Sequence, residues 1–218
     1  MTKQKTAELS AAQFIPENKS LKSLKRAAEA CQGCDLYKFA IQTVFGAGNA
    51  HAKVVFVGEQ PGDGEDKEGL PFVGPAGKLL DKALELAGIR KSEAYFTNAV
   101  KHFKFEWQGK RRLHKKPRPI EVHACYPWLD EEIKEIKPDL VVCLGATAAQ
   151  ALLGNKFKVT QRRGEFIESD GAPYMMATVH PSSILRAPDE ESRHEQMEAF
   201  VSDLKRVASF IRTGKIAQ

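Results

Sequence analysis

The sequence contains no hydrophobic run long enough to cross a lipid bilayer, although 42% of its 218 residues are hydrophobic. Its first residues, MTKQKTAELS, lack the apolar core of a secretion signal, so we expect a cytoplasmic protein with no membrane partner. The sequence also shows no internal repeat and no interdomain linker, and its length suits one hydrophobic core. We expect a monomer with a single domain over residues 1–218, in which residues 1–20 form a poorly ordered or peripheral segment.

Cysteine is scarce, with four residues in the chain: Cys31, Cys34, Cys125 and Cys143. So few cysteines fit poorly with a disulfide scaffold in a reducing compartment, whereas the CQGC pair has the spacing that holds one metal centre. The second close pair that is typical of zinc sites is missing, and an iron–sulfur cluster also accepts thiolates from distant segments. These residues therefore leave zinc and an iron–sulfur cluster both open. Cys143 lies in the strand-like run DLVVCLG, where a cysteine can simply be a small hydrophobe.

Acidic residues are nearly absent from residues 101–118, KHFKFEWQGKRRLHKKPR, which contain five Lys, three Arg and one Glu. The formal net charge of the whole chain is only +5, so the basic excess is local. A segment of this kind binds nucleic-acid phosphates by releasing their counterions. Its cations also disfavour protonation of His114, which leaves the imidazole available as a nucleophile. The segment predicts either a nucleophile held against DNA or a solvated basic loop with an incidental histidine.

The order of the predicted elements is typical of an α/β protein. Hydrophobic patterning predicts strands at 53–58, 94–100, 139–145, 158–168 and 173–179, and helices at 20–30, 75–88, 121–136, 146–154 and 189–213. This succession predicts a parallel sheet covered on both faces by helices. We expect a three-layer α/β/α sandwich with a central, mainly parallel four-stranded sheet, whose ligands bind at the carboxyl ends of the strands.

Polar residues gather where the predicted strands end. The loop GEQPGDGEDKEGLPFVGPAG has glycines that let a planar ligand approach the backbone and a ring, Phe72, that can stack on it, but it lacks the GK[ST] of a Walker phosphate loop. HPSSILR offers an imidazole, two hydroxyls and a guanidinium, which suit a base edge and its phosphates. Asn98 can read a base edge through its amide. Each segment is also compatible with a structural role in an ordinary turn.

Together these segments resemble the uracil-DNA glycosylase superfamily. The motifs GEQPG, PFVGPAG, TNAVKHFKF, LGATAAQALLG and HPSSILR and the cysteine pair are similar to those of its iron–sulfur family 4, from about Cys31 to the final helix. Gln60 within GEQPG and the KRRLH insertion most resemble the branch often called X, whose members become covalently attached to uracil-containing DNA. That branch usually has KRRIH where this chain has KRRLH, so Leu113 replaces the isomeric isoleucine.

The resemblance implies a role for each residue of these motifs. His114 is implied to bond to DNA, with Glu59 as its polar partner beside the sugar. The residues implied to line the uracil pocket are Gly58, Gln60, Asp63, Phe72, Asn98 and His180. Those implied to bind DNA are Lys110, Arg111, Arg112, Ser182, Ser183 and Arg186. A four-iron four-sulfur cluster is implied on Cys31, Cys34, Cys125 and Cys143.

These roles predict a protein that excises uracil from DNA and prefers single strands, because unstacking the base costs least there. His114 is then expected to bond to C1′ of the abasic site, so that the protein acts once. Two alternatives stay open. One is a conventional family 4 enzyme that turns over, and the other is a noncatalytic iron–sulfur DNA-binding module.

Overall fold

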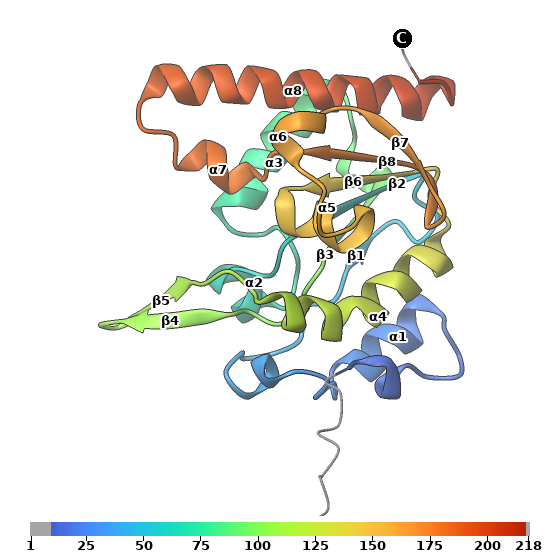
Figure 1. Cartoon of the computed structure of the whole chain (residues 1–218), viewed down its shortest axis with the longest axis vertical. Helices are drawn as coiled ribbons and strands as arrows, with labels where there is room; N and C mark the ends of the chain where they lie inside the picture. Colours follow the sequence, from blue (N-terminus) through green and yellow to red (C-terminus); the bar gives the residue numbers. More distant parts are fainter. Residues whose placement is uncertain (1–9, 217–218) are drawn as a thin grey trace, which may run out of the picture.

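The computed structural model describes residues 10–216 and places a six-stranded sheet between layers of helices (Figure 1). The strands are ordered β1 (Ala47–Gly48), β3 (Ala94–Asn98), β2 (Val54–Gly58), β6 (Leu140–Leu144), β8 (Ala172–Thr178) and β7 (Phe166–Ser169). The inner four are parallel, and the two edge strands run antiparallel to their neighbours. The predicted α/β fold with a mainly parallel sheet is confirmed. The sheet has six strands and not the predicted four, because the short antiparallel strands β1 and β7 are added at its two edges.

The helices cover both faces of this sheet because its inner strands are apolar on both sides. Val54 and Phe56 of β2 pack into a core with α3 (Pro75–Ala87) and α8 (Glu190–Thr213), which also contact α7 (Pro181–Leu185). Val55 and Val57 point to the other face, where they pack with α4 (Pro119–Ile136) and α5 (Ala146–Leu153). Every residue of β2, β3 and β6 is buried, as expected for a parallel sheet covered on both faces.

Shorter elements complete the described part of the chain. They are α1 (Leu21–Ala28), α2 (Asp63–Glu68), α6 (Val159–Arg162) and the 3-10 turns Ala12–Phe14, Asp35–Lys38 and Lys91–Glu93. The strand predicted over 158–168 was wrong in its first half, because α6 precedes β7 there. The structure also forms a two-stranded hairpin from the basic segment, β4 (Phe105–Gln108) and β5 (Arg111–His114), which projects from the body of the molecule (Figure 1). Gly109 takes the positive φ, +58°, that favours glycine in a tight turn.

The first described residues pack against α4. The backbone N–H of Ala11 donates to the carbonyl of Ala124 at 2.7 Å, and Lys19 forms an ion pair with Glu131 at 2.9 Å. Residues 10–20 of the predicted N-terminal segment thus contact α4, whereas residues 1–9 lie outside the described residues. Within residues 10–216, no helix has both the length and the apolar composition that a bilayer span requires.

Candidate active site

Glu59 and His114 face each other at the carboxyl edge of the sheet. Glu59 directly follows β2, and His114 is the last residue of β5. Oε1 of Glu59 lies 3.4 Å from Nε2 of His114, while its Oε2 accepts a hydrogen bond from the hydroxyl of Thr147 at the start of α5. The side chain of His114 is half exposed, at 49%, so the imidazole borders on solvent. The structure thus brings together the two residues that the sequence predicted to be catalytic.

The surroundings of His114 and His180 lower the pKa of each imidazole, which favours the neutral form near pH 7. Burial lowers the pKa of His114 below its ordinary value, with Glu59 acting in the opposite direction and Arg186 in the same direction. Burial, together with His114 and Arg186, lowers the pKa of His180 to about 4. A neutral imidazole retains a lone pair on one ring nitrogen and a proton on the other, so each can act as nucleophile or hydrogen-bond donor.

His180 is held in one tautomer by the turn that it starts. Its Nδ1 accepts a hydrogen bond from the backbone N–H of Ser182 at 3.1 Å. Because that N–H can only donate, Nδ1 carries the lone pair and Nε2 carries the proton. The hydroxyl of Ser182 lies 2.8 Å from the same Nδ1, and that of Ser183 donates to the carbonyl of His180 at 2.8 Å. Both hydroxyls, predicted to contact DNA, have partners within the turn.

Gly58, Phe72 and Asn98 meet at the ends of β2 and β3. A Cβ atom at Gly58 would lie 2.3 Å from Oδ1 of Asn98 and 2.8 Å from the ring of Phe72, so only glycine allows this approach. Asn98 and Phe72 are both buried, and Phe72 has a positive φ of 56°, which is uncommon outside glycine. Its ring packs edge-on against Phe96, with centroids 6.0 Å apart. An amide and an aromatic ring are thus held together, as recognition of a planar base requires.

A buried ion pair, which sequence reasoning did not predict, fixes the end of β3. Lys101 belongs to the basic segment 101–118, but its side chain is 1% exposed. Its ammonium group donates to the carbonyl of Asn98 at 2.8 Å, to the hydroxyl of Thr97 at 2.6 Å and to Glu132. Glu132, on α4, is 0% exposed and also accepts from the hydroxyl of Tyr95 at 2.9 Å. Burial and this carboxylate raise the pKa of Tyr95.

Gln60 holds the base of the hairpin. Its Nε2 donates to the carbonyls of Lys104 and Lys115, both at 3.1 Å, and its Oε1 accepts from the N–H of Lys104 at 3.1 Å. Both amide protons are therefore used by the two chain segments that enter and leave the hairpin. The structure supports a positioning role beside His114, and it does not support the predicted role of Gln60 as an amide lining the pocket.

Arg112 points inward and pins the hairpin to α2. Its guanidinium pairs with Asp63 at 2.6 Å and with Asp66 at 2.5 Å, and its side chain is only 8% exposed. It also lies over the rings of Phe103 and Phe105, at 5.4 and 5.0 Å from their centroids. Hydrogen bonds from Lys67 and Arg112 lower the pKa of Asp63. The structure therefore does not support the predicted roles of Arg112 in DNA binding and of Asp63 in the pocket.

Three of the four cysteines gather in one buried cluster beneath the site. Cys31, Cys34 and Cys125 share a core with Trp128, whose indole N–H donates to the sulfur of Cys31 at 3.2 Å. The backbone N–H of Lys101 donates to the sulfur of Cys125 at 3.2 Å. Burial raises the pKa of Cys34, and that of Cys125 to about 12, so a centre that binds these sulfurs as thiolates must supply positive charge. Hydrogen bonds to sulfur are typical of ligands in iron–sulfur proteins.

Cys143 lies apart from these three. It is fully buried in β6 and belongs to the core between the sheet, α4 and α5. Within residues 10–216, no group of three or more His, Cys, Asp or Glu side chains is arranged to hold a metal ion. The prediction that Cys143 supplies the fourth ligand of a cluster is therefore not supported. The three thiols share one core, but within the described residues they are not arranged as a metal site.

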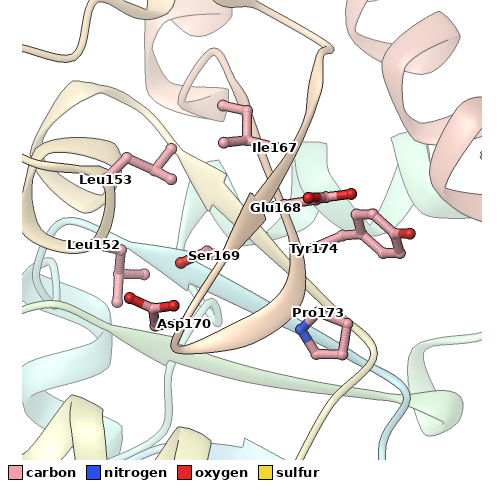
Figure 2. A pocket seen from close by; sticks show the side chains of 8 residues that line it. All are labelled: Leu152, Leu153, Ile167, Glu168, Ser169, Asp170, Pro173 and Tyr174. Carbon is pink, nitrogen blue, oxygen red and sulfur yellow. The ribbon is translucent and has the colours of Figure 1, made fainter.

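A hollow of ≈ 630 Å³ at the β7–β8 edge of the sheet contains none of the predicted site residues. Figure 2 shows that carboxylates and apolar side chains surround it. Its acids, Glu168 and Asp170, would repel a phosphate backbone. This hollow is therefore a poor candidate for a nucleic-acid site, despite its size. Its lining residues are Leu152, Leu153, Ile167, Glu168, Ser169, Asp170, Pro173 and Tyr174.

Comparison with known proteins agrees with this geometry. Residues 45–205 match the family model of the Uracil DNA glycosylase superfamily. The chain is 38% identical to the Type-4 uracil-DNA glycosylase of Thermotoga maritima, over 84% of this chain and 90% of that protein. It is 34% identical to the Type-4 uracil-DNA glycosylase of Archaeoglobus fulgidus, over 86% and 92%. Glu59, His114 and His180 lie within the matched range, and Cys31 and Cys34 lie before it.

Proposed function

The chain belongs to the uracil-DNA glycosylase superfamily, and on that premise we propose that it excises uracil from DNA and then becomes bonded through His114 to C1′ of the abasic site. The observation that carries the proposal is the 3.4 Å approach of His114 to Glu59 at the end of β2. This approach supports a reaction in which His114 is the nucleophile and the Glu59 carboxylate stabilises the sugar. Single-stranded DNA is the preferred substrate, because a base outside a duplex needs no unpairing. Monomeric state and cytoplasmic location stay predictions from the sequence.

Recognition of uracil rests on Asn98, Phe72 and His180. The amide of Asn98 can donate to O4 of uracil, whereas the amino group of cytosine would leave that donor unpaired. Phe72 supplies a ring on which the base stacks. The Nε2–H of His180 can donate to a uracil carbonyl oxygen, on which negative charge grows as the glycosidic bond breaks. The low pKa of His180 supports this role, because the residue donates as a neutral imidazole across the physiological range.

Cleavage leaves the bonding electron pair on uracil and positive charge on the sugar. The carboxylate of Glu59, fixed by the hydroxyl of Thr147, stabilises that positive charge. The lone pair of His114 then forms the new bond to C1′ in place of a water molecule, because a positioned neighbour has a high effective molarity. The resulting imidazolium, attached to C1′, then gives its remaining proton to solvent water. Its departure would require an imidazolate, which is a poor leaving group, so the bond persists and the protein acts once.

A denaturing gel tests this proposal. The protein is mixed with an oligonucleotide that contains one uracil, and a species that stays joined to DNA after heating in detergent is expected. The variant His114→Ala is expected to form no such species and to release uracil repeatedly, since water can then reach the sugar. The matched control, His194→Ala, removes an exposed histidine on α8 and should crosslink like the unaltered protein. Free abasic DNA without a joined species would refute the covalent step.

A conventional enzyme that turns over is the second candidate, and the names of the Type-4 relatives favour it. In that case the hairpin only binds DNA, and His114→Ala leaves the rate of uracil release nearly unchanged. A noncatalytic binding module predicts no uracil release at all, and Glu59→Gln would then change nothing. The gel and a measurement of free uracil, made on the same samples, distinguish these three functions.

We also propose that Cys31, Cys34 and Cys125 bind a shared metal centre, with an iron–sulfur cluster favoured over zinc by the resemblance to family 4. Freshly purified protein is then expected to be brown, with visible absorbance that Cys125→Ser abolishes. Cys143→Ser is the matched control, and it should keep the absorbance because Cys143 lies in a different core. Colourless protein that contains zinc would show that the centre is not iron–sulfur. Loss of colour in Cys143→Ser would restore Cys143 as a ligand.

A further inference from the structure

The hairpin borders a groove that the proposed chemistry does not use. Its volume is ≈ 650 Å³, and it lies between the hairpin, α2 and the segment that contains Phe39 and Ile41. Four large apolar side chains are exposed along it, namely Phe39 at 67%, Ile41 at 61%, Trp107 at 66% and Leu113 at 39%. Apolar side chains gathered on a surface in this way are typical of a binding site.

The charge of the groove suits a polyanion. Lys110 and Arg111 line it, and within residues 10–216 neither forms an ion pair. Its one acid, Asp63, is already paired with Lys67 and Arg112. The groove therefore presents two uncompensated cations beside exposed aromatic rings. Proteins that bind single-stranded nucleic acid combine these two features, since bases stack on the rings while phosphates contact the cations.

The groove and His114 lie on the same hairpin, although His114 does not line the groove. Phe105 pairs with His114 across the hairpin and Trp107 pairs with Arg112, so all four side chains lie on the same face of the two strands. The rings form a chain of contacts: Trp107 packs edge-on against Phe105 at 5.5 Å, Phe105 stacks on Phe103 at 5.2 Å, and Phe103 lies 6.2 Å from His114. Trp107 is thus linked to His114 through neighbouring rings of the same hairpin, within reach of a nucleotide that flanks one bound at His114.

We propose that this groove binds an unpaired nucleotide that flanks the uracil in single-stranded DNA, with its base stacked on Trp107 and its phosphates contacting Lys110 and Arg111. The inference rests on the proposed function, which identifies the bound strand as uracil-containing DNA. It adds a second binding site, for a neighbouring nucleotide of the same strand. A site of this kind makes single-stranded DNA bind more tightly than a duplex, whose bases are not free to stack on the indole.

Tryptophan fluorescence tests the site without any uracil chemistry. The chain contains two tryptophans, of which Trp128 is 0% exposed and Trp107 is 66% exposed. Titration with a uracil-free single-stranded oligonucleotide is expected to quench the emission of Trp107 in a saturable way, and increasing salt should weaken the binding. Trp107→Phe leaves only the buried Trp128, so the same titration should produce no quenching.

Affinity for the same oligonucleotide provides a second readout. Trp107→Ala is expected to weaken binding about tenfold, because stacking on an aromatic side chain is lost. The charge variant Arg111→Ala should weaken binding and also reduce its dependence on salt. Leu86→Ala is the matched control, since Leu86 is exposed at 53% on α3, away from the groove, and its loss should change nothing.

Failure of this inference is distinguishable from failure of the proposed function. Equal affinity of Trp107→Ala and the unaltered protein, or quenching that persists in Trp107→Phe, would overturn the groove as a nucleotide site. Equal quenching by an acidic peptide would also overturn it, in favour of a protein partner. Quenching that depends on Trp107 in a protein that neither releases uracil nor crosslinks would leave the groove intact and refute the glycosylase function instead.

Discussion

The end of β3 and the β4–β5 hairpin are neighbours in the chain, and a buried ion pair holds each of them, but they differ in how exposed their functional side chains are. Asn98 at the end of β3 is fixed by Lys101 and Glu132, which are 1% and 0% exposed. The hairpin ends in the half-exposed His114 and is attached at its base through Gln60 and farther along through the inward-pointing Arg112. The residue proposed to recognise the base is thus part of the core, whereas the residue proposed to form the covalent bond lies on a surface extension. Recognition and bond formation should be separable by mutation.

The largest effect is expected from breaking the buried pair. Lys101→Met leaves the Glu132 carboxylate buried without its cation, which should lower the free energy of unfolding by about 3–5 kcal/mol. Denaturation in urea measures this loss. The matched control is Lys115→Met, which breaks the exposed pair of Lys115 with Glu106 on the hairpin and should change stability little. Equal effects of the two substitutions would contradict the contrast between the two regions.

A smaller effect, on the reaction alone, is expected at the base of the hairpin. Gln60→Ala removes three hydrogen bonds that position the segments on either side of His114, and a displacement of about 1 Å can cost on the order of 100-fold in rate. The rate of crosslinking should fall by that order. Uracil release, measured in the His114→Ala background, should stay nearly constant. A parallel fall in uracil release would instead place Gln60 in the uracil pocket, as the resemblance implied.

The smallest effect is a shift in pH dependence. Protonated His114 has no lone pair, so crosslinking should be lost as the pH falls through its pKa. Because burial and Arg186 lower that pKa, the loss should occur below the ordinary value of 6.5. Arg186→Ala removes one lowering influence and should move the midpoint upwards. The rate of crosslinking measured at saturating DNA between pH 4.5 and 8 checks this, and a midpoint above 6.5 in the unaltered protein would contradict the argument.

The parallel core was predictable because its strands are short hydrophobic runs. The strands within KVVFVG and DLVVCLG are buried on both faces. Because such strands alternate with amphipathic helices along the chain, few sheet topologies other than a parallel one are possible. The position of the site followed from the same rule, since Glu59 directly follows β2 and Asn98 ends β3. Strand β1 was not predictable, because two residues are too few to show an alternation of apolar and polar side chains. It forms through its pairing with β3.

The direction of individual side chains could not be predicted from the basic segment. Lys101 and Arg112 belong to the same run of cations as Lys110, but buried acids on α4 and α2 draw these two into the protein. Glu132 and Asp66 lie outside residues 101–118, so the composition of that segment does not indicate which of its cations form buried ion pairs. Gln60 is similar, because its partners are backbone groups of the hairpin, and no side-chain pattern marks them.

The geometry of the hairpin base has a further consequence. Phe105 and His114 are paired across the two strands, so the chain enters and leaves this extension at neighbouring points. Deleting residues 105–114 would therefore need only a short connection and would remove no strand of the main sheet. On the proposed mechanism this deletion removes the nucleophile His114, and the shortened protein is expected to release uracil repeatedly without remaining bonded to DNA.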